Sequence, residues 1–186
     1  MQNQLRSIRA PWQAGCAAAL LALSLTAYAS LKPGSKAPDF TAQASLGGKV
    51  FSFSLAQALK QGPVVLYFYP AAFTGGCTVE AHEFAEATDR FKALGATVIG
   101  ISHDDIETLN KFSVSECRSK FAVAADADLS ISRSYDATLP LIRRSDRTSY
   151  VIAPDGTIIY AYSAMSPDAH VRNTMDALEK WKSSGR

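Results

Sequence analysis

One cysteine lies where two structural patterns meet. The apolar run 64–69 ends at Pro70, a short loop with two glycines follows, and a helical pattern begins at Cys77. A thiol at a helix N-terminus faces unpaired backbone N–H groups and the positive end of the helix dipole, which favour the thiolate. The thiolate is the nucleophilic form, and Thr74 adds a hydroxyl three residues earlier. These residues predict nucleophilic thiol chemistry at Cys77.

Ionisation alone gives a cysteine only a modest gain in rate. A thiol with an ordinary pKa of about 8.5 is roughly 3% ionised at pH 7, so complete ionisation gains about thirtyfold. A fast reaction at Cys77 therefore needs donors aimed at the incoming atom. The Thr74 hydroxyl can supply one, and an arginine would suit a developing negative charge.

The stretches around Cys77 predict a parallel crossover unit. The unbroken apolar run 64–69 is typical of a strand buried on both faces. Residues 77–94 have helical spacing, with acidic residues early and basic residues late, and Gly95 is a suitable helix end. A second buried strand is predicted at 97–101, so strand, helix and strand follow one another.

The remaining elements predict an α/β, thioredoxin-like fold with a central mixed sheet flanked by helices. An N-terminal β-hairpin is expected within 40–53, around Gly47 and Gly48. Ser166 and Pro167 indicate the start of the last helix. The other expected elements are a helical turn at 55–60, a helix at 105–119, a short strand at 123–125, a short helix at 129–135, and antiparallel strands at 149–153 and 157–162.

The first 29 residues have the pattern of a secretory signal peptide. Arg6 and Arg9 precede an apolar run at 14–25, and a small-x-small triplet ends at Ala29, the expected cleavage site. The apolar segment falls short of the roughly 20 residues that span a bilayer, so no permanent membrane anchor is expected. We therefore expect a signal peptide at 1–29 and one domain at 30–186 in a periplasmic or secreted protein.

Composition argues against several other functions. The chain has 19 basic and 17 acidic residues, and two of the basic ones lie within 1–29, so the mature chain is balanced and nothing suggests nucleic acid. Its two cysteines, Cys77 and Cys117, could also form one structural disulfide. The three histidines, His82, His103 and His170, are scattered along the chain without the spacing of a zinc site. We therefore expect no metal site and no other cofactor.

Four separated motifs resemble those of the peroxiredoxins, the thiol peroxidases of the AhpC/TSA type. Pro70, Thr74 and Cys77 match the PxxxTxxC signature, and GSKAPDF, VIGISHD and RTSYVI are similar to three further family segments in the expected order. The stretch GGCTVEAHEF most resembles the peroxiredoxin Q, or bacterioferritin comigratory protein, group. This resemblance implies a peroxidase that reduces hydrogen peroxide and organic hydroperoxides through a cysteine sulfenic acid.

The resemblance also implies a role for each matching residue. Cys77 would be the peroxidatic cysteine that attacks the O–O bond, and Thr74 would hold the thiolate and the peroxide by hydrogen bonds. Arg147 would stabilise the thiolate and the departing oxygen, and Pro70 would shield the pocket from water. Glu80 would orient the arginine, which is needed there because a carboxylate alone disfavours a thiolate.

Two positions depart from the peroxiredoxin Q pattern. Gly76 stands where the group usually has a rigid proline, and His82 stands where its common resolving cysteine would be. In a second known arrangement the resolving cysteine lies on the next helix; Ser113 aligns with it, and Cys117 lies one turn further on. We therefore predict a Cys77–Cys117 disulfide that forms after local unwinding at Cys77, while a plain core cysteine at Cys117 stays open.

The expected reductant is a thioredoxin-like protein or a small thiol, and the expected assembly is a monomer or homodimer. Two other functions stay open. A thioredoxin-type thiol-disulfide oxidoreductase normally needs a second thiol, but Thr74 and Glu80 occupy the partner positions. The other is a non-catalytic binding or holdase protein that keeps the fold.

Overall fold

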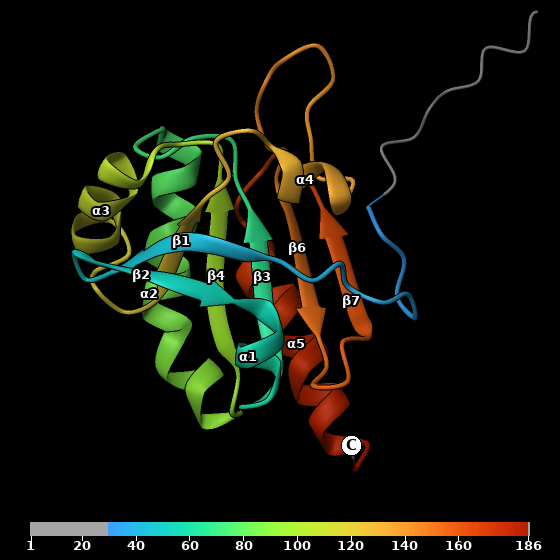
Figure 1. Ribbon diagram of the computed structural model, residues 1–186. Helices are drawn as coiled ribbons and strands as arrows, with labels where there is room; N and C mark the ends of the chain where they lie inside the picture. The colour runs from blue at the N-terminus through green and yellow to red at the C-terminus, as the bar shows by residue number, and fades with distance from the viewer. Residues whose placement is uncertain (1–29, 186) are drawn as a thin grey trace, which may run out of the picture.

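Residues 30–185 are described by a computed structural model, and the predicted signal peptide at 1–29 lies outside them. Within this range the chain forms a seven-stranded sheet in the order β2-β1-β5-β4-β3-β6-β7 (Figure 1). The strands are β1 (Thr41–Leu46), β2 (Lys49–Ser54), β3 (Val64–Phe68), β4 (Thr97–Ser102), β5 (Ala122–Ala125), β6 (Thr148–Ile152) and β7 (Ile158–Ser163). The helices are α1 (Leu55–Leu59), α2 (Gly75–Ala93), α3 (Ile106–Ser115), α4 (Ser130–Ser134) and α5 (His170–Ser183).

The centre of the sheet is the predicted crossover unit. β3 pairs in parallel with β4 and antiparallel with β6, and every residue of β3 and β6 is buried. Burial on both faces explains the unbroken apolar sequence of β3, whereas β6 begins with Thr148 and Ser149, whose hydroxyls are hydrogen-bonded. Together with the β1–β2 hairpin this arrangement confirms the predicted thioredoxin-like plan.

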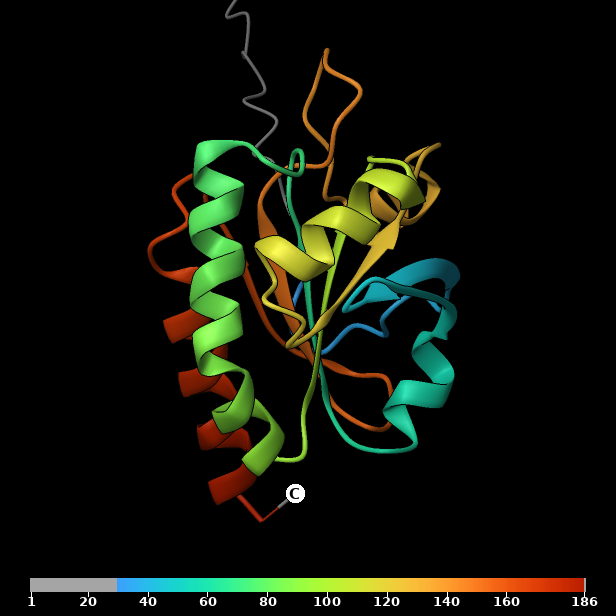
Figure 2. The same ribbon diagram turned by 90° about the vertical axis from the view of Figure 1, so that its left-hand side faces the viewer.

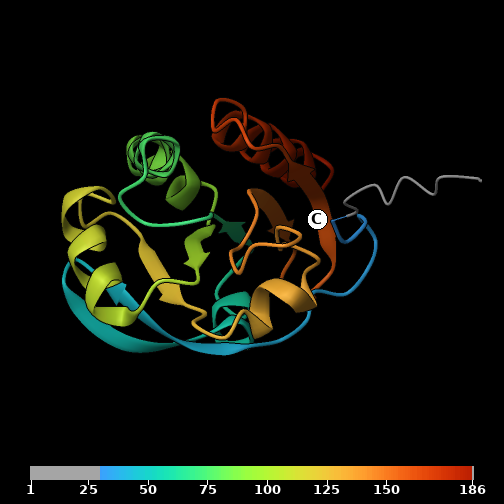
Figure 3. The ribbon, with the colours of Figure 1, turned by 90° about the horizontal axis from the view of Figure 1, so that it is seen from above.

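Helices cover both faces of the sheet (Figure 3). One face carries a core of side chains from α2, α3 and α5, with Phe84, Phe112 and Leu178 among them. The opposite face packs against α1 and α4 through residues such as Leu55 and Ile131. Figure 2 shows α2 and α5 side by side along the first face. Between residues 30 and 185 no helix is both long enough and apolar enough to cross a membrane.

The helix that carries Cys77 begins earlier than predicted. Thr74 is its extended N-cap, and Gly75 and Gly76 form its first two residues, so Cys77 is the third residue of α2 and not the first. At Gly76 a side chain would crowd the arginine that precedes β6, because an added Cβ would lie 3.1 Å from Arg147 Nη2. The predicted end is confirmed: Gly95 takes a φ of +75° and donates its N–H to the Lys92 carbonyl at 2.8 Å.

Two other helix ends differ from the prediction. α3 stops at Ser115 because Arg118 and Ser119 adopt left-handed backbone angles, with φ values of 49° and 55°. Cys117 therefore lies beyond the helix. α5 begins only at His170, since the hydroxyl of Ser166 donates to the Asp168 carboxylate and does not cap the helix.

Candidate active site

The topology explains how residues 70 positions apart come together. β3 runs into the loop that ends at the N-terminus of α2, where Cys77 lies. β6 is antiparallel to β3 and pairs Thr148 with Phe68, so the start of β6 lies beside the end of β3. Arg147 immediately precedes β6 and is therefore next to the loop that leads to Cys77.

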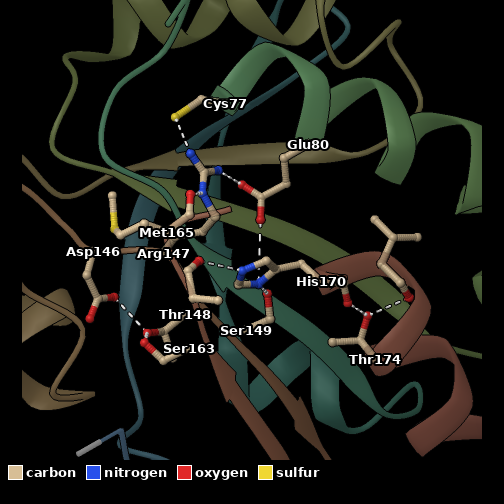
Figure 4. A network of polar contacts seen from close by, with 12 residues as sticks. Cys77, Glu80, Asp146, Arg147, Thr148, Ser149, Ser163, Met165, His170 and Thr174 are labelled. Carbon is tan, nitrogen blue, oxygen red and sulfur yellow. Dashed lines mark hydrogen bonds and ion pairs between the residues drawn. The ribbon is translucent and has the colours of Figure 1, made fainter. Parts of the chain in front are cut away.

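Cys77 is buried and contacts a cation. Its side chain is 2% exposed, and Arg147 Nη2 donates to its Sγ at 3.4 Å (Figure 4). The sulfur lies in the first turn of α2, where the dipole and unpaired N–H groups favour negative charge. The predicted meeting of a nucleophilic thiol with Arg147 is thus present in the structure.

Arg147 is fixed by three different acceptors. Besides the sulfur, its Nε donates to the Met165 carbonyl at 2.9 Å and its Nη1 donates to Glu80 Oε2. Burial acts to lower the pKa of Arg147, but the neighbouring Glu80 carboxylate and Cys77 sulfur outweigh burial and raise it. The guanidinium is therefore a permanent charge with little freedom to move.

Glu80 holds the side of the guanidinium that faces away from Cys77. The carboxyl group is completely buried, and burial raises its pKa to about 8 although Arg147 opposes this shift. Its Oε1 has no hydrogen-bond partner and lies 3.7 Å from Nδ1 of His170, the first residue of α5. Glu80 therefore occupies the orienting position that the sequence predicts, with a histidine behind it (Figure 4).

Thr74 is close in sequence but makes a different contact from the expected one. Its hydroxyl donates to the Ala71 carbonyl at 2.9 Å, and no hydrogen bond joins it to Cys77. Phe73, just before it, is half-exposed with a φ of 61°. The loop is held instead by Asp104, whose Oδ2 accepts from the Ala72 N–H at 2.7 Å.

The other predicted residue of this loop, Pro70, is partly buried at the end of β3. Its carbonyl accepts a long hydrogen bond of 3.4 Å from Arg144. Arg144 belongs to the loop between α4 and β6, which projects beyond the same end of the sheet (Figures 1 and 2). Pro70 is thus linked to the exposed loop that carries Arg144.

Cys117 is a second free thiol in the same apolar core. It is fully buried and belongs to the cluster that contains Cys77, Tyr67 and Tyr69. Burial, and to a smaller extent the charge of Glu116, raises the pKa of the Cys117 thiol well above its ordinary value. Cys117 is therefore unreactive in this conformation.

Three side-chain contacts join α2 to the segment 116–120 that contains Cys117: two ion pairs, and a His82–Glu116 contact that is ionic only when the imidazole is protonated. They are His82–Glu116 at 2.8 Å, Glu86–Arg118 at 3.1 Å and Asp89–Lys120 at 3.2 Å. The first is partly buried and the other two are exposed. We call these contacts the α2 ion-pair ladder. His82, at the position where a resolving cysteine was sought, takes part in this ladder.

Comparisons with known proteins identify the family to which the chain belongs. The AhpC/TSA family matches residues 33–161. Peroxiredoxin Q, chloroplastic, of Oryza sativa subsp. japonica is 34% identical over 148 residues, which are 78% of this chain and 66% of the rice protein. The corresponding protein of Gentiana triflora is 33% identical over 157 residues, which are 83% of this chain and 70% of that protein.

The chain is similar in fold to the solved structure of peroxidoxin BcpB from Mycobacterium tuberculosis. It superimposes with a TM-score of 0.74 at 30% identity and covers 81% of this chain and 97% of its own. The chain spans about two thirds of the length of the rice protein but nearly all of the mycobacterial one. Because the family match extends over well more than half of its residues, the chain belongs to the AhpC/TSA family and is a peroxiredoxin similar to the peroxiredoxin Q proteins.

Proposed function

We propose that this protein reduces hydrogen peroxide and organic hydroperoxides at Cys77. The Cys77 thiolate attacks one oxygen of the hydroperoxide and the O–O bond breaks. The sulfur keeps that oxygen as a sulfenic acid, and the other oxygen leaves, takes a proton and departs as water or an alcohol. The observation that carries the proposal is the hydrogen bond of 3.4 Å from Arg147 Nη2 to Cys77 Sγ. Glu80 forms an ion pair with the same guanidinium.

Arg147 supplies the stabilisation that ionisation alone does not. In this first step negative charge moves from the sulfur to the leaving oxygen, so a fixed cation beside both atoms favours the transition state over the reactants. The guanidinium needs no reorganisation because Glu80 and the Met165 carbonyl already orient it. Thr74 completes the proposed site once its hydroxyl turns from Ala71 toward the bound peroxide, while Pro70 limits access of water.

Cys117 is proposed as the resolving cysteine. Its thiol attacks the Cys77 sulfenic acid, a disulfide forms and one water leaves; a thioredoxin-like protein or a small thiol then gives two electrons and two protons to restore both thiols. Because Cys117 is buried, this step needs local opening. Left-handed backbone at Arg118 and Ser119, unfavourable by roughly 1–2 kcal/mol each, supports opening at this segment.

The test is the mass of the reduced protein after one equivalent of hydrogen peroxide, with peptide mapping and no added reductant. Loss of two hydrogens with Cys77 linked to Cys117 is the expected result. Gain of one oxygen at Cys77 would retain the peroxidase and remove Cys117 from its mechanism. An unmodified Cys77, with a response identical to that of Cys77→Ser, would refute the peroxidase function.

The proposed export has its own test. Expression of the full chain in a Gram-negative host should give a mature N-terminus at Ser30, located by N-terminal sequencing of the periplasmic fraction. An uncleaved chain that stays in the cytoplasmic fraction would contradict the predicted signal peptide.

A further inference from the structure

A completely buried histidine lies behind the arginine of the active site. His170 Nε2 is 2.9 Å from the Ala164 carbonyl oxygen, which can only accept, so this nitrogen carries a hydrogen. In a neutral ring Nδ1 then has a lone pair. That lone pair faces Ser149 Oγ at 2.8 Å and Glu80 Oε1 at 3.7 Å.

The Glu80 oxygen on this side has no donor. Oε2 receives the Arg147 hydrogen bond, but Oε1 is buried without any partner. If both groups lacked a proton, a carboxylate lone pair would face an imidazole lone pair in a space closed to water. Buried polar atoms are rarely left in this way. Nδ1 already accepts from the Ser149 hydroxyl, so Oε1 is the atom left without a partner, and a proton on Oε1 removes the repulsion between the two lone pairs.

The charge of the buried cluster leads to the same conclusion. Arg147 is a single cation, while Cys77 as a thiolate and Glu80 as a carboxylate are two anions. A buried group with an uncompensated negative charge is strongly unfavourable. One proton on the far side of Glu80 makes the cluster neutral when Cys77 is ionised.

We propose that Glu80 carries a proton on Oε1, opposite the Nδ1 lone pair of His170, and that this proton leaves the charge of Arg147 available to the Cys77 thiolate. His170 is thus a positioning residue that acts on the sulfur through Glu80 and Arg147. The proposal rests on the proposed role of Cys77 as the nucleophile. It assigns a function to a histidine that touches neither the sulfur nor the guanidinium.

The other charged groups around the pair agree with one proton near neutral pH. Burial raises the pKa of Glu80 to about 8, against the opposing effect of Arg147 from the start of β6, and Glu83 on α2 raises it further. The β3 side contributes Tyr67, whose hydroxyl is buried without a partner. Burial lowers the pKa of His170 to about 4, and Arg147 lowers it as well. Between these values the proton lies on the Glu80 side.

Infrared spectroscopy can detect this proton directly. In the Cys117→Ser background at pH 7, we expect the carbonyl band of a protonated carboxylic acid, and the band should be missing from Glu80→Gln. An identical spectrum of the two proteins in this region would mean that Glu80 is ionised and would overturn the proposal. The band does not depend on peroxide turnover, so it is informative even if the peroxidase function fails.

Alkylation of Cys77 measured against pH tests the effect on the sulfur. His170→Gln keeps a donor for the Ala164 carbonyl but has no group at the Nδ1 position. Without the Nδ1 lone pair opposite Oε1, a Glu80 carboxylate is less unfavourable and forms more readily, so the pH midpoint of alkylation should rise by up to about one unit. In the Glu80→Gln background the same substitution should cause no shift, because an amide has no proton to lose.

Thr174→Val is the matched control. Its hydroxyl donates to the backbone carbonyl of His170 at 2.7 Å, so the substitution disturbs the start of α5 without touching the proton. The proposal predicts a shift with His170→Gln and none with Thr174→Val. Equal shifts in the two variants, or an equal shift in both Glu80 backgrounds, would mean that His170 is only structural. If His170→Gln fails to fold, the infrared comparison decides the question by itself.

Discussion

Replacement of Arg147 by methionine removes the cation that contacts Cys77 and keeps a buried side chain of similar length. The native guanidinium is 4% exposed and makes three contacts: the sulfur at 3.4 Å, the Met165 carbonyl at 2.9 Å and the Glu80 carboxylate. Methionine can make none of these hydrogen bonds. The substitution therefore changes both the reaction of Cys77 and the environment of Glu80.

The size of the rate effect follows from the hydrogen bond to the sulfur. A hydrogen bond that involves a charged group contributes about 1.5–3 kcal/mol. If Arg147 contributes this amount in the transition state, the second-order rate constant should fall roughly tenfold to 150-fold. The stability effect is separate: a buried pair broken by loss of one partner costs about 3–5 kcal/mol if the other stays charged. Because Glu80 is proposed to hold a proton at pH 7, this cost should be small there and should grow as the pH rises above about 8.

Stopped-flow kinetics with hydrogen peroxide and urea unfolding of the same variants separate the two effects. Arg144→Met is the matched control, since this exposed arginine contacts the Pro70 carbonyl and not the sulfur. Above pH 8, Glu80→Gln combined with Arg147→Met should recover stability, but it should not recover rate. If Arg147→Met folds and reacts within threefold of the native rate, the role assigned to Arg147 is wrong.

Three further predictions concern the second cysteine and the buried pair. Cys117→Ser should complete one peroxide turnover and then stop with a dithiol reductant; continued turnover would show direct reduction of the sulfenic acid. Glu116→Gln breaks a partly buried pair of the α2 ion-pair ladder, so disulfide formation should accelerate up to about fivefold, whereas Glu179→Gln, which breaks an exposed pair elsewhere, should leave it unchanged. The native pair Glu80 and His170 should show opposing pH effects on stability. The lowered pKa of His170 contributes stability above pH 6.5 that is lost as the pH falls toward 4, whereas the raised pKa of Glu80 contributes stability below pH 4.5 that is lost as the pH rises through 8. Glu80→Gln leaves only the first effect, and its urea midpoint should fall more steeply from pH 6.5 to 4.5 than the native one; parallel curves would contradict both shifts.

The strands and the main site residues could be predicted because their signals are local. An unbroken apolar run is what burial on both faces requires, so β3 and β4 were visible in the sequence. The motif around Cys77 placed a thiol at a helix start, and the segment at 147–152 placed Arg147 before a strand. Both predictions depend on short stretches of chain, and the sheet register then brings the two stretches together.

The end of α3 and the contacts of His170 could not be predicted in the same way. The apolar spacing continues through Cys117, although the helix stops before it. The left-handed backbone at Arg118 and Ser119 could not be predicted, because neither residue is a glycine, the usual signal of this conformation. For His170 a weak signal existed: it shares the buried side of α5 with Thr174 and Leu178, at intervals of four residues. Its partners lie on β6 and α2, far away in the chain, and only the fold identifies them.

The two cysteines place opposite requirements on the same core. In the proposed reaction Cys77 needs a fixed cation. Arg147 is fixed by the buried carboxyl group of Glu80. As the proposed resolving cysteine, Cys117 needs release from an apolar environment in which its thiol is unreactive. The structure separates these requirements along α2. The first turn of the helix belongs to the rigid cluster of Glu80 and Arg147, while the α2 ion-pair ladder further along holds the segment of Cys117 by contacts that are individually weak. Local opening at the ladder can therefore expose Cys117 without loss of the contacts that orient Arg147.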